Sequence, residues 1–372
     1  MDFNLNSEQQ LLQDSVRRFI DKAYAFEARA AIVKQGQGGS TAHWGTFAEN
    51  GWLAAALPEE WGGLGGSIVE TALIAHEFGR GLVVEPYLGC AVLAAQTVMA
   101  GGTAAQKDRL LQVLADGSRR IALAYSEPAS RGMPLPVATI AQRSDIGYVL
   151  QGRKSLVLGA GQAHEFIVSA RMAGAAEDEI TLFLVGANSP GLQRHTLPLH
   201  DGTWAEDLVF DGVKVTADKV LGSAGQGLEA LRTGLAHGTV ALCAELVGAM
   251  EKAIEVTALY LNTRKQFGVA IGSFQALQHR LADMAAEMEL ARSMLYAALA
   301  SVLNDDAATR QATLSAAKTL IGRAAKTVCG QAIQLHGGIG MTEEYLVGHY
   351  FKRAVVAELL LGSSERHEAA CA

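Results

Sequence analysis

The sequence is poor in the features that mark several common classes of protein. Its only cysteines are Cys90, Cys243, Cys329 and Cys371, and no two of them form a CxxC pair. A disulfide-stapled secreted fold and a redox-active dithiol are therefore not expected, and reduced thiols in a cytosolic protein are the simpler interpretation. Charged residues make up only 19% of the chain and hydrophobic residues 49%, which is the balance of a globular protein rather than a disordered one.

Positive charge is also scarce. The chain has 31 lysines and arginines against 38 aspartates and glutamates, a net charge of −7, and nucleic-acid binding normally needs a basic face. No run of eighteen apolar residues predicts a membrane span. The first ten residues, MDFNLNSEQQ, lack the basic and then apolar segments of a secretory signal. We therefore expect no nucleic acid, no membrane and a cytoplasmic location.

Several catalytic signatures are missing. The string most like a dinucleotide-binding fingerprint, Gly159-Ala160-Gly161, continues with His164 where a glycine is needed. None of the ten histidines lies in an HExxH or other metal-binding spacing, so no metal site is expected. The absence of a GxSxG elbow argues against an α/β-hydrolase.

Periodicity divides the chain into three parts, and its 372 residues suit two or three domains. Residues 1–120 have helical spacing, with capping boxes expected at Ser7/Gln10 and Ser67/Glu70, and a further helical stretch from about 91 to 115. Residues 121–222 contain short apolar or β-branched runs that predict strands of an antiparallel sandwich or barrel. These runs are Ile121–Tyr125, Val137–Ala141, Tyr148–Gln151, Ser155–Leu158, Phe166–Ala170, Ile180–Val185 and Ala205–Phe210.

Residues 223–372 are helical again and rich in Ala and Leu. Long helices are expected near 227–263, 272–303 and 308–335, separated by Asn304-Asp305-Asp306 and ended by Gly337-Gly338. Helices of this length pack side by side as a bundle. Because their apolar residues cover more than one face, we also expect an obligate oligomer, and specifically a tetramer. The predicted fold class is α+β in the order helical domain, antiparallel β domain, four-helix bundle.

Two strings in the last domain indicate ligand binding. In the first, Arg264 stands where one long helix ends, and Phe274 and Gln275 stand where the next begins. A guanidinium at such a junction can grip a pyrophosphate with paired hydrogen bonds, although a solvated basic helix end has the same appearance. In the second, Gln334-Leu335-His336 precedes Gly337-Gly338. Gln334 can bond a ribose or an adenine where the glycines let backbone approach, and a glycine-rich turn is the alternative.

Together, these strings resemble the acyl-CoA dehydrogenase family, and the resemblance extends over essentially the whole chain. It includes Pro58-Glu59-Glu60-Trp61-Gly62-Gly63, Ser126-Glu127-Pro128, Gly152-Arg153-Lys154, Arg264 through Gln275 and Gln334 through Tyr345. The resemblance implies FAD as cofactor, removal of two hydrogens from an acyl-CoA with a glutamate as base, and an electron-transfer flavoprotein as acceptor. It further implies that each FAD spans two subunits, one holding the ring and the acyl-CoA, the other the adenosine.

The adenosine-binding elements of the family match this sequence. The resemblance assigns them to Arg264, Phe274, Gln275, Gln334, Leu335, His336, Gly337, Gly338 and Ser363.

The elements for the ring and the substrate do not match. The loop after Pro128 lacks the family's Ser-Asp pair, the Trp-Ile-Thr strand reads Leu156-Val157-Leu158, and a CoA-side arginine aligns with Thr239. The two positions that the family uses for its base are occupied by Leu361 and Gly238, so no catalytic residue is assigned. Glu358 and Glu365 are the nearby substitutes to consider. General-base catalysis contributes roughly 10²–10⁴ in rate, so its loss is not minor.

Loss of one half of the site and retention of the other resembles the small subunits of heteromeric acyl-CoA dehydrogenases, including the pimeloyl-CoA type, which act in fatty acid or dicarboxylic acid degradation. The expected partner is a paralogous catalytic subunit. Two alternatives stay open: a homomeric flavoenzyme with a displaced base or none, and a flavin-free acyl-CoA-binding scaffold.

Overall fold

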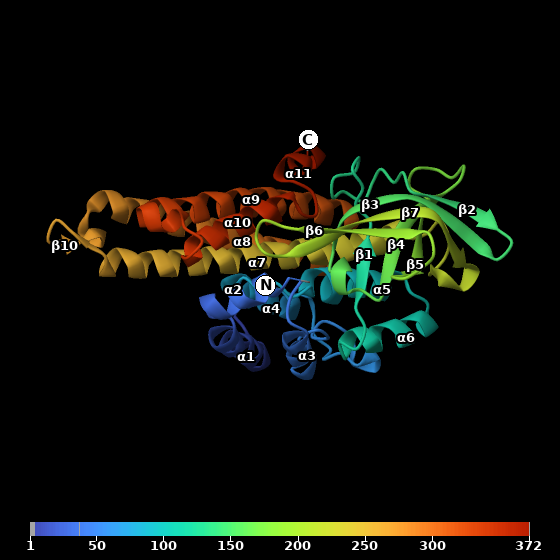
Figure 1. Cartoon of the computed structure of the whole chain (residues 1–372), viewed down its shortest axis with the longest axis horizontal. Coiled ribbons are helices and arrows are strands. Elements are labelled where there is room, and N and C mark those ends of the chain that lie inside the picture. The colour runs from blue at the N-terminus through green and yellow to red at the C-terminus, as the bar shows by residue number, and fades with distance from the viewer. Residues whose placement is uncertain (1–3, 37, 372) are drawn as a thin grey trace. The chain divides into compact units, whose positions relative to one another are not determined.

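The computed structural model describes residues 4–36 and 38–371, and Figure 1 labels the elements. The polar start at residues 1–3 lies outside the described residues, as does the side chain of Cys371. Cys90, Cys243 and Cys329 are buried free thiols. The expected order of a helical segment, a β segment and a helical bundle is confirmed.

The N-terminal segment is helical. Its elements are α1 (Ser7–Ala23), α2 (Phe26–Gln35), α3 (Thr41–Glu49), η1 (Glu59–Trp61), α4 (Ile68–Gly81), the π-helix η2 (Tyr87–Ala94), α5 (Ala95–Gly101) and α6 (Ala104–Ala115). The helical stretch expected from 91 to 115 is thus divided among η2, α5 and α6. The backbone is extended at Gly102 (φ −71°, ψ 145°), which separates α5 from α6.

Capping chemistry explains where two of these helices begin. The Ser67/Glu70 box is confirmed, since Glu70 Oε2 accepts from the Ser67 N–H at 2.6 Å. The Ser7/Gln10 box is wrong by one residue. Asn6 is the N-cap of α1: its Oδ1 accepts from the Gln9 N–H at 2.8 Å, and Gln9 Oε1 accepts from the Asn6 N–H at 3.1 Å. Asparagine is as good an N-cap as serine, and the sequence offered both.

The middle segment is one eight-stranded sheet in the order β6-β7-β3-β2-β4-β5-β8, with β1 beside β4. The pairs are antiparallel except β1–β4 and β2–β4, which are parallel. The strands are β1 (Ile121–Ala124), β2 (Ile140–Ser144), β3 (Gly147–Leu158), β4 (Glu165–Met172), β5 (Ile180–Gly186), β6 (Leu192–Pro198), β7 (Trp204–Thr216) and β8 (Val220–Leu221); η3 (Ala160–Gln162) and η4 (Ala217–Lys219) are short turns between them.

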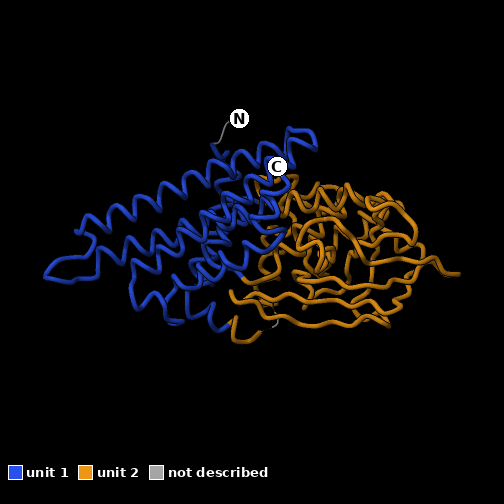
Figure 2. Tube along the Cα trace, turned by 90° about the horizontal axis from the view of Figure 1, so that it is seen from above, with its two compact units in different colours: residues 1–31, 72–83, 239–372 blue, residues 32–71, 84–238 orange. Residues whose placement is uncertain are grey.

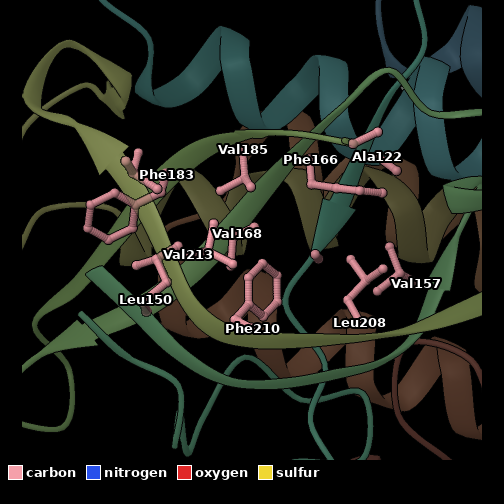
Figure 3. Packing of buried hydrophobic residues seen from close by; sticks show 14 of the residues in the cluster. Ala122, Leu150, Val157, Phe166, Val168, Phe183, Val185, Leu208, Phe210 and Val213 are labelled. Carbon is pink, nitrogen blue, oxygen red and sulfur yellow. The ribbon is translucent and has the colours of Figure 1, made fainter. Parts of the chain in front are cut away.

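Aromatic and branched aliphatic side chains of the sheet pack together in a buried hydrophobic core. Phe166, Phe210, Leu208, Val168 and Val213 belong to one core cluster in which each is fully buried, as Figure 3 shows. Alternate residues of a strand face the same side, so the alternating positions 208 and 210 both point into this core.

The C-terminal segment is the expected bundle, with helices running lengthwise beside one another in Figure 1. Its elements are α7 (Leu228–Thr263), β9 (Lys265–Gln266), β10 (Val269–Ala270), η5 (Ile271–Ser273), α8 (Gln275–Asn304), α9 (Ala307–His336), η6 (Gly337–Met341), α10 (Leu346–Leu359) and α11 (Ser364–Cys371). Asp306 caps α9 by accepting from the Ala308 and Thr309 N–H groups at 2.9 and 3.1 Å.

The chain forms two compact units, coloured in Figure 2. Unit 1 comprises residues 1–31, 72–83 and 239–372, and unit 2 comprises residues 32–71 and 84–238. The N-terminal helices are therefore shared between a unit built on the bundle and a unit built on the sheet.

Helix α7 is the only described helix long and apolar enough to cross a membrane by length and composition. However, 78% of its most apolar stretch is buried within the protein. That is the burial of a core helix in a bundle, whose apolar surface is covered by other helices.

Candidate functional site

The first part of the candidate site is the connection between α7 and α8. The carbonyl of Arg264, just after α7, accepts from the Ile271 N–H at 2.9 Å. Between them the chain makes a short hairpin whose turn residues, Phe267 and Gly268, have φ of 52° and 83°. Two-residue hairpins need this left-handed conformation, which glycine adopts without strain and phenylalanine does not. The hairpin thus brings the chain back beside Arg264 at Ile271, three residues before Phe274, the N-cap of α8.

Side chains of this connection are exposed although several are apolar. Phe267 is 91% exposed and Phe274 38%, and their rings meet edge to face with centroids 6.2 Å apart. The Arg264 guanidinium is exposed and has no ion pair in the described part of the chain. Gln275 begins α8, and the N-cap Phe274 provides no side-chain hydrogen bond. The Arg264 cation and the N-terminus of α8 can bind an anion, and the exposed rings of Phe267 and Phe274 can stack on a flat ligand.

The second part of the site is the end of α9. Gly337, with φ 64°, follows the last residue of α9. A Cβ atom added to Gly337 or Gly338 would meet no atom within 4 Å, so the space beside this backbone is open to a ligand. Gln334 is exposed one turn earlier. Leu335 and His336 are only 5% and 3% exposed, so a ligand would meet their backbone rather than their side chains.

Tyr260 joins the two parts. Its hydroxyl donates to the His336 carbonyl at 3.3 Å, and its ring stacks on the imidazole with centroids 4.3 Å apart. Tyr260 is one turn before Arg264, whose N–H donates to the Tyr260 carbonyl at 2.8 Å. On the adjoining helices, Arg280 donates to Gln331 at 2.9 Å. The two strings of the sequence therefore meet at one end of the bundle.

His336 has a structural role in this arrangement. Its Nδ1 lies 2.7 Å from the Ala332 carbonyl, and a carbonyl only accepts, so Nδ1 carries the proton. Burial lowers the pKa of His336, against the opposing effect of that hydrogen bond. The ring is accordingly neutral near pH 7 and fixes the end of α9.

Ser363 does not lie with this group. It stands in the turn before α11, where Thr319 of α9 donates to the carbonyl of the neighbouring Ser364 at 3.3 Å. Thr319 precedes Gln334 on the same helix by fifteen residues, or about 22 Å of helix length. Ser363 and the exposed Glu365 thus belong to a different region of the bundle from Arg264 and Gln334.

That region contains the turn at Leu361, which is 6% exposed and has φ 57°. His367 Nε2 donates to the Leu361 carbonyl at 2.8 Å, and His367 Nδ1 lies 3.1 Å from Ser315 Oγ. Lys318, fully buried, donates to the Glu358 carbonyl at 3.0 Å. Burial lowers the pKa of Lys318 to about 8. The turn is firmly held but presents no carboxylate at residue 361.

Glu358 is engaged in capping. Its Oε1 accepts from the Ser364 N–H at 3.0 Å, at the start of α11, and lies 4.0 Å from Lys326 Nζ. A carboxylate at a helix N-terminus stabilises the helix in its charged form. At Gly238, the other position where the resemblance predicts a base, α7 has no side chain, and the neighbouring Thr239 is buried.

In the β segment, the hydroxyls of the loop after β1 bond to the loop itself. Ser126 Oγ accepts from the Gly132 N–H at 3.0 Å, and Ser130 Oγ accepts from the Glu127 N–H at 2.9 Å. Leu156 is 38% exposed with φ 52°, and its N–H donates to Asp207 Oδ1 at 3.1 Å. These positions supply neither an aromatic face nor a free hydroxyl.

Sequence reasoning missed two features. The first is a buried ion pair between Lys154 and Glu127, 2.7 Å apart, both of which lie within the strings that carried the resemblance. The second is the exposure of Val269, Ile339 and Met341 beside the two parts of the site, at 44%, 44% and 77%. Apolar residues in glycine-containing loops were the available signal. No group of three or more His, Cys, Asp or Glu that could hold a metal is found among the residues described.

Comparison with known proteins gives consistent matches along the chain. Three family models match in succession: acyl-CoA dehydrogenase, N-terminal domain, at residues 6–118; middle domain, at 122–213; and C-terminal domain, at 225–372. Benzylmalonyl-CoA dehydrogenase of Aromatoleum aromaticum is 31% identical over 375 residues, covering 98% of this chain and 97% of that protein.

Solved structures agree with these matches. The ChsE4-ChsE5 complex from Mycobacterium tuberculosis superposes with a TM-score of 0.90 at 26% identity, covering 100% of this chain and 97% of that one. The FAD complex of PigA superposes with a TM-score of 0.90 at 25% identity, covering 100% and 98%.

Proposed function

This chain belongs to the acyl-CoA dehydrogenase family, and we propose that it is the non-catalytic subunit of a heteromeric, FAD-dependent acyl-CoA dehydrogenase. In this assembly a paralogous subunit carries the base and the flavin-ring site for α,β-dehydrogenation of a CoA thioester. The present chain binds the pyrophosphate and adenosine of the paralogue's FAD. An electron-transfer flavoprotein is the proposed acceptor, and the cytoplasm the proposed location.

The observation that carries this proposal is the contrast between two regions of one chain. At the end of the bundle, Arg264 is exposed and unpaired within the described residues, and the backbone at Gly337 is open. At the turn before α11, by contrast, Leu361 is buried and cannot remove a proton. Uniform loss of function would have altered both regions, whereas a division of labour preserves one.

The residues at the end of the bundle fit the adenosine half of FAD. Arg264 and the N-terminus of α8 can neutralise a pyrophosphate. Gln334 can bond the ribose or the adenine, and the exposed rings of Phe267 and Phe274 can cover the flat base. When bound, FAD supplies the acceptor for the hydride that leaves the acyl chain.

Two similar structures support the assignment. ChsE4-ChsE5 is named as a complex of two different chains, and PigA is named as an FAD complex. The present chain shares the fold of both over its full length. A paired arrangement and an FAD site are therefore compatible with this fold.

The test is to measure FAD against protein by absorbance, for the chain alone and for the chain co-purified with a paralogue that carries the missing glutamate. We expect about half a flavin per chain in the complex, because only the paralogue's ring sites are complete. One flavin per chain in a homomer, together with robust dye-coupled turnover, would overturn the proposal. Glu365→Gln would then test the exposed carboxylate as a displaced base.

Arg264→Ala gives the sharper test. Loss of a charge-assisted hydrogen bond to the pyrophosphate removes about 1.5–3 kcal/mol, or roughly 10- to 150-fold in FAD affinity. The complex should lose FAD although the paralogue is unaltered. Arg109→Ala removes the same charge from an exposed position of α6, a helix that contributes no residue to the proposed grip, and should leave FAD bound. Equal FAD affinity in both variants would show that Arg264 does not grip the cofactor.

A further inference from the structure

The crossing of α4 and α7, at residues of both helices that belong to unit 1, brings the two helix backbones into direct contact. A Cβ added to Gly79 of α4 would lie 1.9 Å from the carbonyl oxygen of Glu245 on α7. In the reverse direction, a Cβ on Gly248 of α7 would lie 1.9 Å from the carbonyl oxygen of His76 on α4. Each helix thus has a glycine where the other presents a carbonyl. No side chain intervenes, so the groups beside this crossing decide how firmly it is held.

His76 stands beside the crossing between two carboxylates. Its Nδ1 lies 3.3 Å from Glu77 Oε1, and its Nε2 lies 3.2 Å from Glu251 Oε2 on α7. Ionised carboxylates only accept hydrogen bonds, so both ring nitrogens must donate, and only the imidazolium has two N–H groups. A neutral ring would turn one nitrogen lone pair toward a carboxylate. The geometry therefore requires a protonated ring.

We propose that His76 is a proton-dependent clasp that fastens α4 to α7: protonated, it bridges Glu77 and Glu251 across the backbone contact, and deprotonated, it releases one of them. Glu77 lies on α4 and Glu251 on α7, two helices that are far apart in sequence. The clasp therefore couples the packing of the N-terminal helices on the bundle to pH.

Other charged groups surround this cluster on five helices, and the cations among them favour the ionised form of Glu77 and Glu251. Arg17 of α1 donates to Glu77 Oε1 at 2.7 Å, and Gln13 donates to the same oxygen at 3.2 Å. Arg80 of α4 donates to Glu251 at 2.5 Å and to Glu255 at 2.9 Å. The remaining charged groups are Asp14 on α1, Lys252 on α7, which pairs with Glu255, Arg292 on α8, which pairs with Glu251 and Glu289, and Arg353 on α10, which pairs with Glu245.

The ionisation of the cluster agrees with the geometry. Burial by itself lowers the pKa of His76, but its hydrogen bonds to Glu251 and Glu77 outweigh burial, so that the pKa is raised above its usual value. The hydrogen bond from His76 is also the largest cause that lowers the pKa of Glu251 to about 2. Because the pKa of His76 is higher in the folded than in the unfolded chain, its stabilisation is complete below its usual pKa. It is lost as pH rises through the folded value.

Hydrogen–deuterium exchange of residues 72–83 tests the clasp in the full chain. Rates for wild type and His76→Gln are compared at the same pH, which cancels the intrinsic dependence of exchange on pH. We expect faster exchange in the variant at pH 6 and convergence of the two rates at alkaline pH. At low pH, the exchange rate of His76→Gln divided by that of wild type should be tenfold for each unit by which the folded pKa of His76 exceeds the unfolded pKa. His195→Gln, at an exposed position of β6, is the matched control and should follow wild type.

Two further measurements keep the test decisive if His76→Gln does not fold. Nitrogen chemical shifts of ¹⁵N-histidine in the wild-type protein report whether both ring nitrogens carry protons at pH 7. Glu251→Gln keeps the ring but removes one partner, and should bring the titration of His76 to lower pH. A His76 ring with one unprotonated nitrogen at pH 7, or an exchange ratio that does not change with pH, would overturn the proposal.

Discussion

The buried ion pair of the β segment allows a quantitative prediction. Lys154 is fully buried, and its Nζ donates to Glu127 Oε1 at 2.7 Å, to Ser169 Oγ at 2.9 Å and to the Tyr125 carbonyl at 3.3 Å. Three hydrogen bonds satisfy the whole donor capacity of the ammonium group. Lys154→Met removes the cation but fills most of the same volume with apolar atoms.

The magnitude follows from what remains around Glu127. Its carboxylate would keep the Thr139 hydroxyl at 2.7 Å, the Thr139 N–H at 3.0 Å and the Ala138 N–H at 2.6 Å. Breaking a buried ion pair by removing one partner destabilises by about 3–5 kcal/mol, and the three remaining donors place this case at the lower end, about 3 kcal/mol. The double variant Lys154→Met/Glu127→Gln leaves no buried charge and keeps an amide oxygen as the acceptor for the Thr139 donors. It should therefore be more stable than Lys154→Met alone.

The assay is urea denaturation at pH 7, with unfolding rates measured if the transition is irreversible. Lys214→Met, at an exposed position of β7, is the control for loss of a lysine and should change stability by less than about 0.5 kcal/mol. The reasoning is supported if wild type is the most stable, the double variant is less stable and Lys154→Met is the least stable. A double variant that is less stable than Lys154→Met would refute it, since the uncompensated charge would then not be the cause of the loss.

Three other substitutions probe the bundle and the N-terminal helices. Gly248→Ala should destabilise by at least about 1–3 kcal/mol, because its Cβ would lie 1.9 Å from a backbone oxygen. Gly45→Ala, in α3 with nothing within 4 Å, should instead stabilise by about 0.5–1 kcal/mol; thermal unfolding of both decides whether backbone contact is the reason. Glu358→Gln keeps an acceptor for the Ser364 N–H, so turnover of the heteromeric complex should stay within a few-fold of wild type. A loss of roughly 10²–10⁴ would identify Glu358 as a base after all.

The long helices of the bundle could be predicted from the sequence because their ends carry strong local signals. The expected stretch 308–335 corresponds to α9 (Ala307–His336), which begins at the Asp306 cap and ends at Gly337. Strand β6 was missed because its alternate residues are polar and exposed, as in Gln193 and His195. Strand β3 was predicted as two pieces because bulges and Gly152 interrupt its pattern, although the chain continues as one strand.

The candidate site could be predicted only in part. Resemblance named Arg264 and Gln334, and the structure places their helices together through Tyr260. Ser363 shares their family assignment but lies elsewhere in the bundle, which no local pattern indicates. The pairs Lys154–Glu127 and His76–Glu251 join residues that are distant in sequence. A lysine or a histidine in such a pair looks like any solvated one until the fold has buried it.

The turn at Leu361 shows that the fold does not depend on a carboxylate at this residue. His367 and Lys318 hold its backbone through the carbonyls of Leu361 and Glu358, and Glu358 itself caps α11. None of these bonds involves the side chain at residue 361. Replacement of a carboxylate there by leucine therefore leaves the framework intact, and the buried leucine adds apolar contact in place of a charge that would need a partner. If a paralogue supplies the base, as we propose, leucine at residue 361 therefore costs this chain no stability.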